Sequence, residues 1–109
     1  MNVLDKLARN GITLAYEDIV KLCVKYHITK MSIFGSVLRD DFSNGSDVDI
    51  LVSYENYKEN NNPFDFLYIE DDFEQLLNRE VDVVDIDELT NPIRRKKILS
   101  TCEVVYVVQ

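Results

Sequence analysis

The sequence predicts an α/β domain, an α+β arrangement with a small mixed sheet and helices packed largely on one side. Segments with apolar residues at helical spacing alternate with short apolar runs of strand length. Two Asn-Pro pairs, which are typical of helix starts, precede two of the helical segments. The chain has 109 residues, enough for one core. We therefore expect a single domain over residues 1–109, in the order helix, helix, strand, short helix, strand, helix, strand, helix, strand.

Two helices are expected before the first strand. Apolar residues in the segment 3–8 recur at helical spacing, and Gly11 can close that helix in a left-handed conformation. Thr13 is the expected N-cap of the second helix. The segment 30–34 then alternates polar and apolar residues, as a strand does. The expected inward face of the second helix is Ile19, Leu22, Cys23 and Tyr26.

The second half of the chain repeats the alternation of helix and strand. Residues 53–62 are polar and lack a hydrophobic period, so we expect a mobile loop there. Asn62-Pro63 predicts the start of an amphipathic helix, which leads into a strand over residues 80–86. Asn91-Pro92 predicts a second such start, before a terminal strand over residues 103–108.

The composition is typical of a globular domain and disfavours several classes of function. The chain is 46% hydrophobic and 29% charged, as soluble globular domains are. Its net charge of −8 disfavours binding to DNA or RNA, because polymer binding needs clustered basic residues. We expect neither a membrane span nor a signal peptide, and a cytoplasmic location by default. Cys23 and Cys102 are expected to be small apolar residues and not a disulfide framework, and His27 has no partner at zinc spacing.

The segment 33–52 carries the residues that suggest chemistry. In a strand, Asp47 and Asp49 lie on one face while Val48 and Ile50 point into the core. Two neighbouring carboxylates repel each other unless a cation lies between them, and oxygen ligands on a rigid strand suit Mg²⁺. Asp-x-Asp pairs on exposed strands are common, however, and either half of this segment taken alone is weak support.

The other half of the segment is a Gly-Ser pair. Gly35 lets the backbone approach a phosphate closely, and Ser36 offers its N–H and hydroxyl at the first turn of a short helix. Gly-Ser is also one of the commonest dipeptides in turns. The combination of strand, Gly-Ser, ten residues, Asp-x-Asp and apolar strand predicts a site for a metal-bound nucleoside triphosphate.

This combination resembles the signature of the DNA polymerase β-like nucleotidyltransferases, in particular the minimal nucleotidyltransferases (MNT), the MntA-like antitoxins of HEPN toxins. The resemblance implies the polymerase β-like fold. Arg39 stands where the family has an arginine after Gly-Ser, so it joins Gly35 and Ser36 as a nucleotide-binding candidate, although Asp40 replaces the family's glycine. Arg39 could equally pair with a loop carboxylate. Ser46 is expected to brace the strand start beside the nucleotide.

A third carboxylate completes the expected catalytic and metal-binding set of Asp47, Asp49 and Asp82. In the family the third acid lies within a strand after the long helix, and the run 81–84, VDVV, resembles that strand. Asp85 points to the opposite face of the same strand and remains the alternative. With three carboxylates, two Mg²⁺ ions can be held.

The resemblance implies that AMP is transferred from ATP to a tyrosine hydroxyl of a HEPN ribonuclease toxin, which is thereby neutralised in a hetero-oligomer. The expected catalytic core takes up all 109 residues, so we expect a separate protein to supply the acceptor. Two alternatives stay open: a non-enzymatic antitoxin that masks its toxin, and an aminoglycoside-type nucleotidyltransferase. The basic run Arg94–Lys97 is expected to be mainly a solvated face, with one or two side chains able to reach the triphosphate or a partner.

Overall fold

The computed structural model describes residues 3–38, 47–54 and 65–108, and it confirms the predicted α/β architecture with a mixed sheet. The expected order of helices and strands is also confirmed, with one additional short 3₁₀ helix after the third strand. In chain order the elements are α1 (Val3–Arg9), α2 (Tyr16–Lys25), β1 (Ile28–Phe34), the 3₁₀ helix η1 (Gly35–Leu38), β2 (Val48–Tyr54), α4 (Asp65–Leu77), β3 (Val81–Asp85), the 3₁₀ helix η2 (Ile86–Glu88), α5 (Pro92–Thr101) and β4 (Glu103–Val107).

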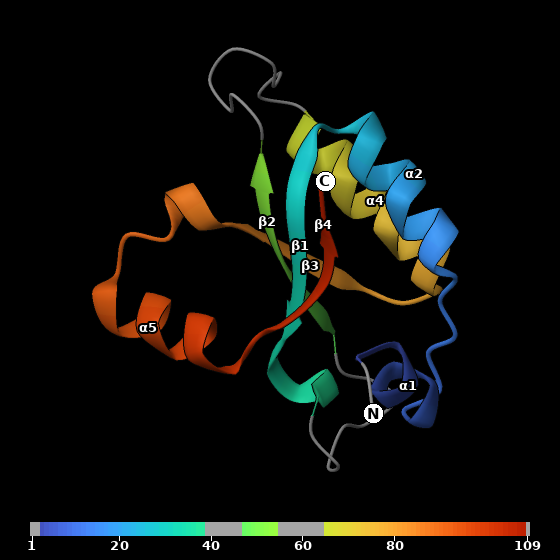
Figure 1. Ribbon diagram of the computed structural model, residues 1–109, viewed down its shortest axis with the longest axis horizontal. Coiled ribbons are helices and arrows are strands. Elements are labelled where there is room, and N and C mark those ends of the chain that lie inside the picture. Colours follow the sequence, from blue (N-terminus) through green and yellow to red (C-terminus); the bar gives the residue numbers. More distant parts are fainter. Residues whose placement is uncertain (1–2, 39–46, 55–64, 109) are drawn as a thin grey trace.

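The strands form one sheet in the order β3-β2-β1-β4 (Figure 1). β1 is antiparallel to both β2 and β4, whereas β2 and β3 are parallel. A parallel pair needs a crossover connection, and α4 provides it between β2 and β3. The parallel pair is the one that carries the predicted carboxylates, so its register decides where they meet.

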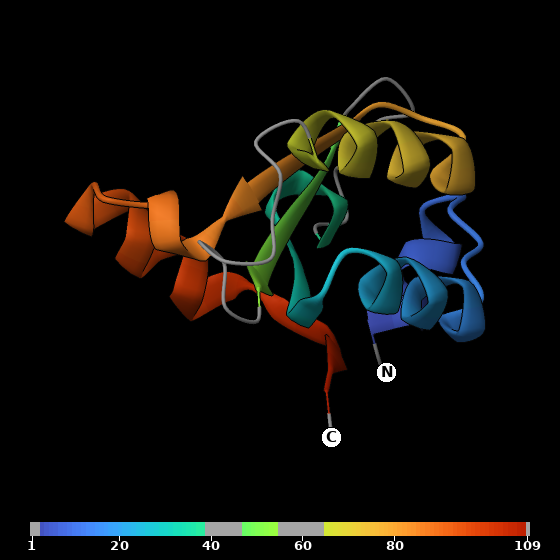
Figure 2. The ribbon, with the colours of Figure 1, turned by 90° about the horizontal axis from the view of Figure 1, so that it is seen from above.

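The two faces of the sheet are covered differently. α1, α2 and α4 pack on one face, where the fully buried side chains of Leu7, Ile19 and Phe73 join those of the strands. We call this the helix-covered face. Figure 2 shows α5 on the opposite side of the sheet from α2 and α4. The expectation that helices lie largely on one side therefore holds for three helices, and α5 is the exception.

The opposite face has a smaller apolar cluster. We call it the cleft face, because an open cleft described below lies on it. Phe34 of β1 and Leu51 of β2 pack there with Leu89 and with Ile98 of α5. In the antiparallel β1–β2 pair Phe34 lies opposite Asp49, so Asp49 is on the cleft face too. One face of the sheet thus carries most of the core, and the other is left for polar side chains.

The first helix ends as predicted, whereas the second begins later than predicted. Gly11 has a φ of +82°, and the Ile12 N–H donates to the Leu7 carbonyl at 2.9 Å. The prediction that Thr13 caps α2 is wrong, because the N-cap is Ala15, whose side chain makes no capping bond. Two acidic residues in the first turn stabilise the start of α2 instead, because negative charge interacts favourably with the positive end of the helix dipole.

The polar segment after β2 is shorter than predicted. Ser53 and Tyr54 belong to β2, because they pair with Lys30 and Ile28 of β1. Residues 55–62, the rest of the predicted loop, lie outside the described residues, as does the Asn62-Pro63 helix start. Phe34 ends β1 and Glu103 starts β4 as predicted, and the remaining strand ends differ from prediction by one or two residues.

The two cysteines are free. Cys23 is buried in the main core as predicted, and burial raises the pKa of its thiol to about 12. Cys102 is only partly buried, beside the smaller cluster. Among the helices that the structure describes, none has both the length and the apolar composition that crossing a membrane requires.

Asn91 caps α5, and its loss should destabilise the protein. Its side-chain oxygen accepts from the N–H groups of Ile93 and Arg94 at 3.0 and 3.1 Å. We expect Asn91→Ala to lower the free energy of unfolding by about 1 kcal/mol. Asn91→Asp keeps the acceptor and should stay close to wild type. Chemical denaturation of both variants measures the difference, and an unchanged Asn91→Ala midpoint would contradict the role of the cap.

Candidate nucleotidyl-transfer site

Asp49 is held on the cleft face at the second position of β2. Val48 and Ile50, its neighbours, are completely buried in the main core. The alternation of a strand therefore directs Asp49 to the other face, where it is partly buried. Asp47 lies directly before β2 and is exposed. As predicted, Val48 and Ile50 point into the core, whereas Asp47 and Asp49 do not.

Gly35 is required by its contact with Asp49. It follows the last residue of β1 and has a φ of +84°, a conformation that other residues rarely adopt. A Cβ atom at this position would lie 2.3 Å from Oδ2 of Asp49 and 3.3 Å from its Cγ. The absence of a side chain therefore lets the Asp49 carboxylate lie directly against the backbone at the start of η1.

Asp82 is the register partner of Asp49 in the parallel β2–β3 pair. Its neighbours Val81 and Val83 are buried in the main core, so Asp82 lies on the cleft face and is exposed. Asp85 behaves differently: it is 3% exposed, and its Oδ1 accepts from the Asp87 N–H at 2.8 Å, capping η2. Asp82 thus shares the cleft face with Asp49 and its metal-binding role remains a prediction, whereas Asp85 caps η2.

The electrostatics of Asp49 reflect its neighbours. Burial raises the pKa of Asp49, the negative charges of Asp82 and then Asp47 raise it further, and the Arg94 guanidinium lowers it. Each of the two other predicted carboxylates thus acts on Asp49. A divalent cation would relieve this repulsion, and carboxylate oxygens are the donors that Mg²⁺ prefers. In the arrangement of the described residues, no three potential ligands are gathered closely enough to hold an ion.

The structure describes only some of the residues that were predicted to bind phosphate. Ser36 lies within η1, and the following residue, Val37, is fully buried. The Asn10 side chain of α1 donates to the Val37 carbonyl at 2.7 Å and so ties η1 to α1. Arg39 and Ser46 lie outside the described residues, and their predicted contacts with a nucleotide remain predictions.

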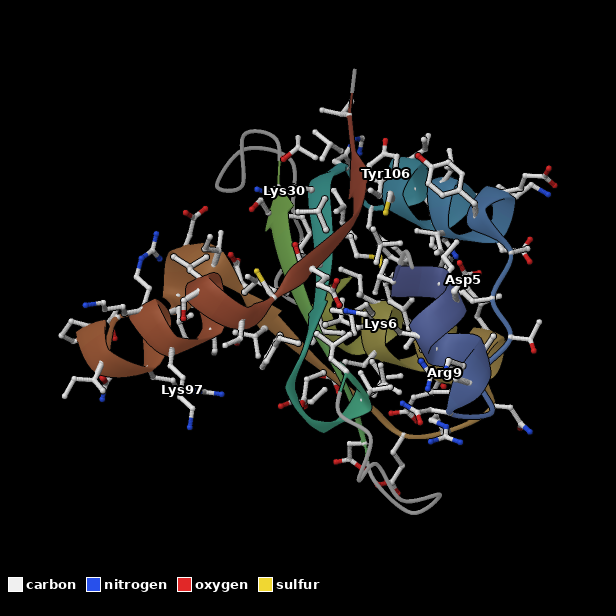
Figure 3. All side chains as sticks on the ribbon, turned by 60° about the horizontal axis from the view of Figure 1, so that its bottom comes forward. Asp5, Lys6, Arg9, Lys30, Lys97 and Tyr106 are labelled. Carbon is white, nitrogen blue, oxygen red and sulfur yellow. The ribbon has the colours of Figure 1, made fainter. Side chains whose placement is uncertain are left out.

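An open cleft of about 750 Å³ lies in front of Asp49 and Gly35. A volume of this size accommodates a nucleotide. Lys6 of α1 and Glu103 at the start of β4 also line it, and they form an ion pair at 2.9 Å. Figure 3 labels Lys6 and Lys97, which come from α1 and α5 on either side of β4. The complete described lining is Lys6, Phe34, Gly35, Leu38, Asp49, Arg94, Lys97, Ile98, Thr101 and Glu103.

Sequence reasoning missed three charged residues near Asp49 and Asp82. Lys6 and Glu103 are 97 positions apart, so no local pattern indicates their pairing. Glu70 of α4 is the third: burial and then the charge of Asp82 raise its pKa, while a backbone hydrogen bond from Val83 lowers it. It occupies an ordinary position of an amphipathic helix, which gives no signal. Only the packing of α4 against β3 brings it close to Asp82.

Replacing Gly35 should disturb more than replacing Gly11, although both have positive φ. Gly11→Ala introduces a Cβ with nothing within 4 Å, so only the left-handed backbone is strained, by about 1 kcal/mol. Gly35→Ala adds the collision with Asp49, which should destabilise by a further amount of about 1 kcal/mol or more. Chemical denaturation of both variants gives the comparison. Equal losses would show that the close contact with Asp49 is unimportant.

Asp85→Asn should change how stability depends on pH. Burial raises the pKa of Asp85 in the folded protein above its unfolded value. The folded state is therefore favoured at low pH, and the contribution of Asp85 is lost as the pH rises through the folded pKa. Asparagine keeps the acceptor for Asp87 and carries no charge. In a denaturation series, the variant should gain stability relative to wild type as the pH rises above about 4, the ordinary pKa of an aspartate, and a difference that stays constant with pH would exclude this effect.

Comparison with known proteins identifies the family. The profile of the family described as "Polymerase beta, Nucleotidyltransferase" matches residues 17–108, which include every candidate residue. A protein of Methanocaldococcus jannaschii that carries the provisional name protein adenylyltransferase is 30% identical over 82 residues. The aligned part covers 75% of this chain and 84% of that protein.

Solved structures agree in fold. A chain provisionally described as a minimal nucleotidyltransferase matches with a TM-score of 0.68 at 28% identity, covering 94% of both chains. A chain of a toxin–antitoxin complex with AMP-PNP matches with a TM-score of 0.69 at 18% identity, covering 88% of this chain and 76% of its own. A complex of a tri-AMPylated Shewanella oneidensis HEPN toxin with its MNT antitoxin gives 0.60 at 17% identity, covering 86% and 71%. With the profile match over most of its length, the chain belongs to the polymerase beta nucleotidyltransferase family.

Proposed function

We propose that this chain is a Mg²⁺-dependent protein adenylyltransferase that transfers AMP from ATP to a tyrosine hydroxyl of a HEPN toxin and thereby neutralises it. The observation that carries the proposal is the position of Asp49: it lies against Gly35, beside its register partner Asp82, at the wall of a cleft large enough for a nucleotide. Family membership supports the reaction class. The relative named as a protein adenylyltransferase and the complexes with AMP-PNP and an AMPylated HEPN toxin support the donor and the acceptor.

In this proposal each residue has a defined task. Asp47, Asp49 and Asp82 would hold the divalent cations, which when bound neutralise phosphate charge and lower the pKa of the acceptor hydroxyl. The Gly35 backbone and Ser36 hold the terminal phosphates. Asp82 is exposed and accepts the proton of the tyrosine hydroxyl. The tyrosine oxygen then bonds to the α-phosphorus, the bond to the β-phosphate bridging oxygen breaks, and pyrophosphate leaves.

Water is the competing nucleophile. The cleft is open, and Asp47 and Asp82 are exposed. An acceptor protein docked over this face would both present its hydroxyl and exclude water from the α-phosphate. The proposal therefore requires the acceptor to be a surface large enough to cover the cleft, which a protein provides and a small molecule does not.

A labelling experiment tests the transfer. The purified chain is incubated with Mg²⁺, ATP labelled in the α-phosphate, and the product of the neighbouring gene. We expect label on a tyrosine of that partner, and at least about a hundredfold less with Asp47→Ala plus Asp49→Ala, because the charge stabilisation is lost. The control variant, Glu17→Ala plus Asp18→Ala, removes the same charge from the first turn of α2. This helix packs on the helix-covered face, away from the cleft, so the control should label its partner normally.

The outcomes separate the alternatives. No label from the wild-type chain, or equal label from the Asp47–Asp49 double variant, would refute adenylylation of the partner. Toxicity assays in cells provide a second measurement on the same variants. If the double variant still neutralises the partner, the chain silences it by binding alone.

A further inference from the structure

The four consecutive basic residues of α5 have different surroundings. Arg95 donates from its guanidinium to the Ile86 carbonyl at 2.8 Å, which ties α5 to η2. Arg94 and Lys97 are three positions apart, so they project from the same side of the helix, and both line the cleft that contains Asp49. Lys96 is exposed and is not part of the cleft wall. The basic run therefore divides into one packing residue, one solvated residue and two cleft residues.

The cleft is more positive than the chain around it. The whole chain has 12 basic and 20 acidic residues, whereas the described cleft wall has three basic and two acidic side chains. One basic residue, Lys6, is paired with Glu103 through both carboxylate oxygens. Within the described part of the chain, Arg94 and Lys97 form no ion pair. Two cations are thus left in a cleft of an acidic protein, where they attract an anionic ligand.

Arg94 also occupies a position that does not favour helix stability. It is in the first turn of α5, which contains no acidic residue, and a positive charge there opposes the helix dipole. Its side chain lines the same cleft as Asp49. An arginine that disfavours its own helix yet lies close to the site residue is better explained by a ligand than by folding.

We propose that Arg94 and Lys97 bind the phosphate chain of the nucleotide in the cleft that Gly35 and Asp49 also line. This inference rests on the proposed function, because it takes the nucleoside triphosphate as the ligand. Arginine suits the role because its planar guanidinium pairs with two phosphate oxygens, and lysine supplies a point charge one turn further along. The polyphosphate then contacts these two basic side chains in the cleft that contains Asp49.

Binding measurements on single variants of α5 test this inference. Arg94→Ala and Lys97→Ala are compared with Lys96→Ala, which removes the same charge from the same helix outside the cleft. Calorimetric titrations use two probes, MgATP and inorganic tripolyphosphate, which has the phosphates but no base. Each cleft variant should bind both probes roughly tenfold more weakly, as expected for the loss of one charged hydrogen bond, and Lys96→Ala should match wild type. The melting temperature of Arg94→Ala should equal or exceed that of wild type.

The possible results distinguish this inference from the proposed function. If wild type binds MgATP and the cleft variants bind both probes as Lys96→Ala does, the phosphate role of α5 is refuted while the transferase proposal stands. A loss confined to MgATP, with tripolyphosphate unaffected, also refutes it. If wild type binds neither probe, both proposals fail.

Discussion

The contact between Gly35 and the Asp49 carboxylate is the constraint on which the site depends. It exists because β1 and β2 pair antiparallel with Phe34 opposite Asp49, so that the residue after Phe34 meets the start of β2. A side chain there would displace the Asp49 carboxylate, and the backbone conformation at Gly35 also favours glycine. The Gly35 turn and the start of β2 are thus joined by a close contact, and a shift of either strand would separate them.

The pairing of β1 and β2 also explains why one face of the sheet contains the main core and the other contains Asp49. The helix-covered face buries Ile33, Ile50 and Val83 beneath α1, α2 and α4, and it contains most of the apolar core. This burial fixes the register of the strands, because a slip of one residue would turn every core side chain to the other face. The stability of one face therefore holds Asp49 and Asp82 in place on the other.

Charge is distributed unevenly in a way that suits a polyphosphate ligand. The chain has a net charge of −8, and burial, followed by the negative charges of Asp82 and Asp47, raises the pKa of Asp49. In the cleft that Asp49 lines, α5 supplies Arg94 and Lys97, while Lys6 neutralises Glu103. A metal-bound nucleotide would suit both kinds of charge, because it carries cations and phosphates together. The same charges would repel a polymer from the rest of the surface.

The sequence determined those features that depend on local spacing. Strand alternation placed Asp49 opposite the core residues and separated Asp82 from Asp85, and Asn91 before a proline marked the start of α5. Local spacing predicted the cap of α2 wrongly, because several neighbouring residues can begin a helix and the first-turn acids favour one of them. The tertiary structure alone decided which distant residues come together: Lys6 pairs with Glu103, Glu70 lies near Asp82, and Arg94 and Lys97 line the same cleft as Asp49. These contacts join elements far apart in the chain, and they form only when helices pack against a sheet whose register the whole core has fixed.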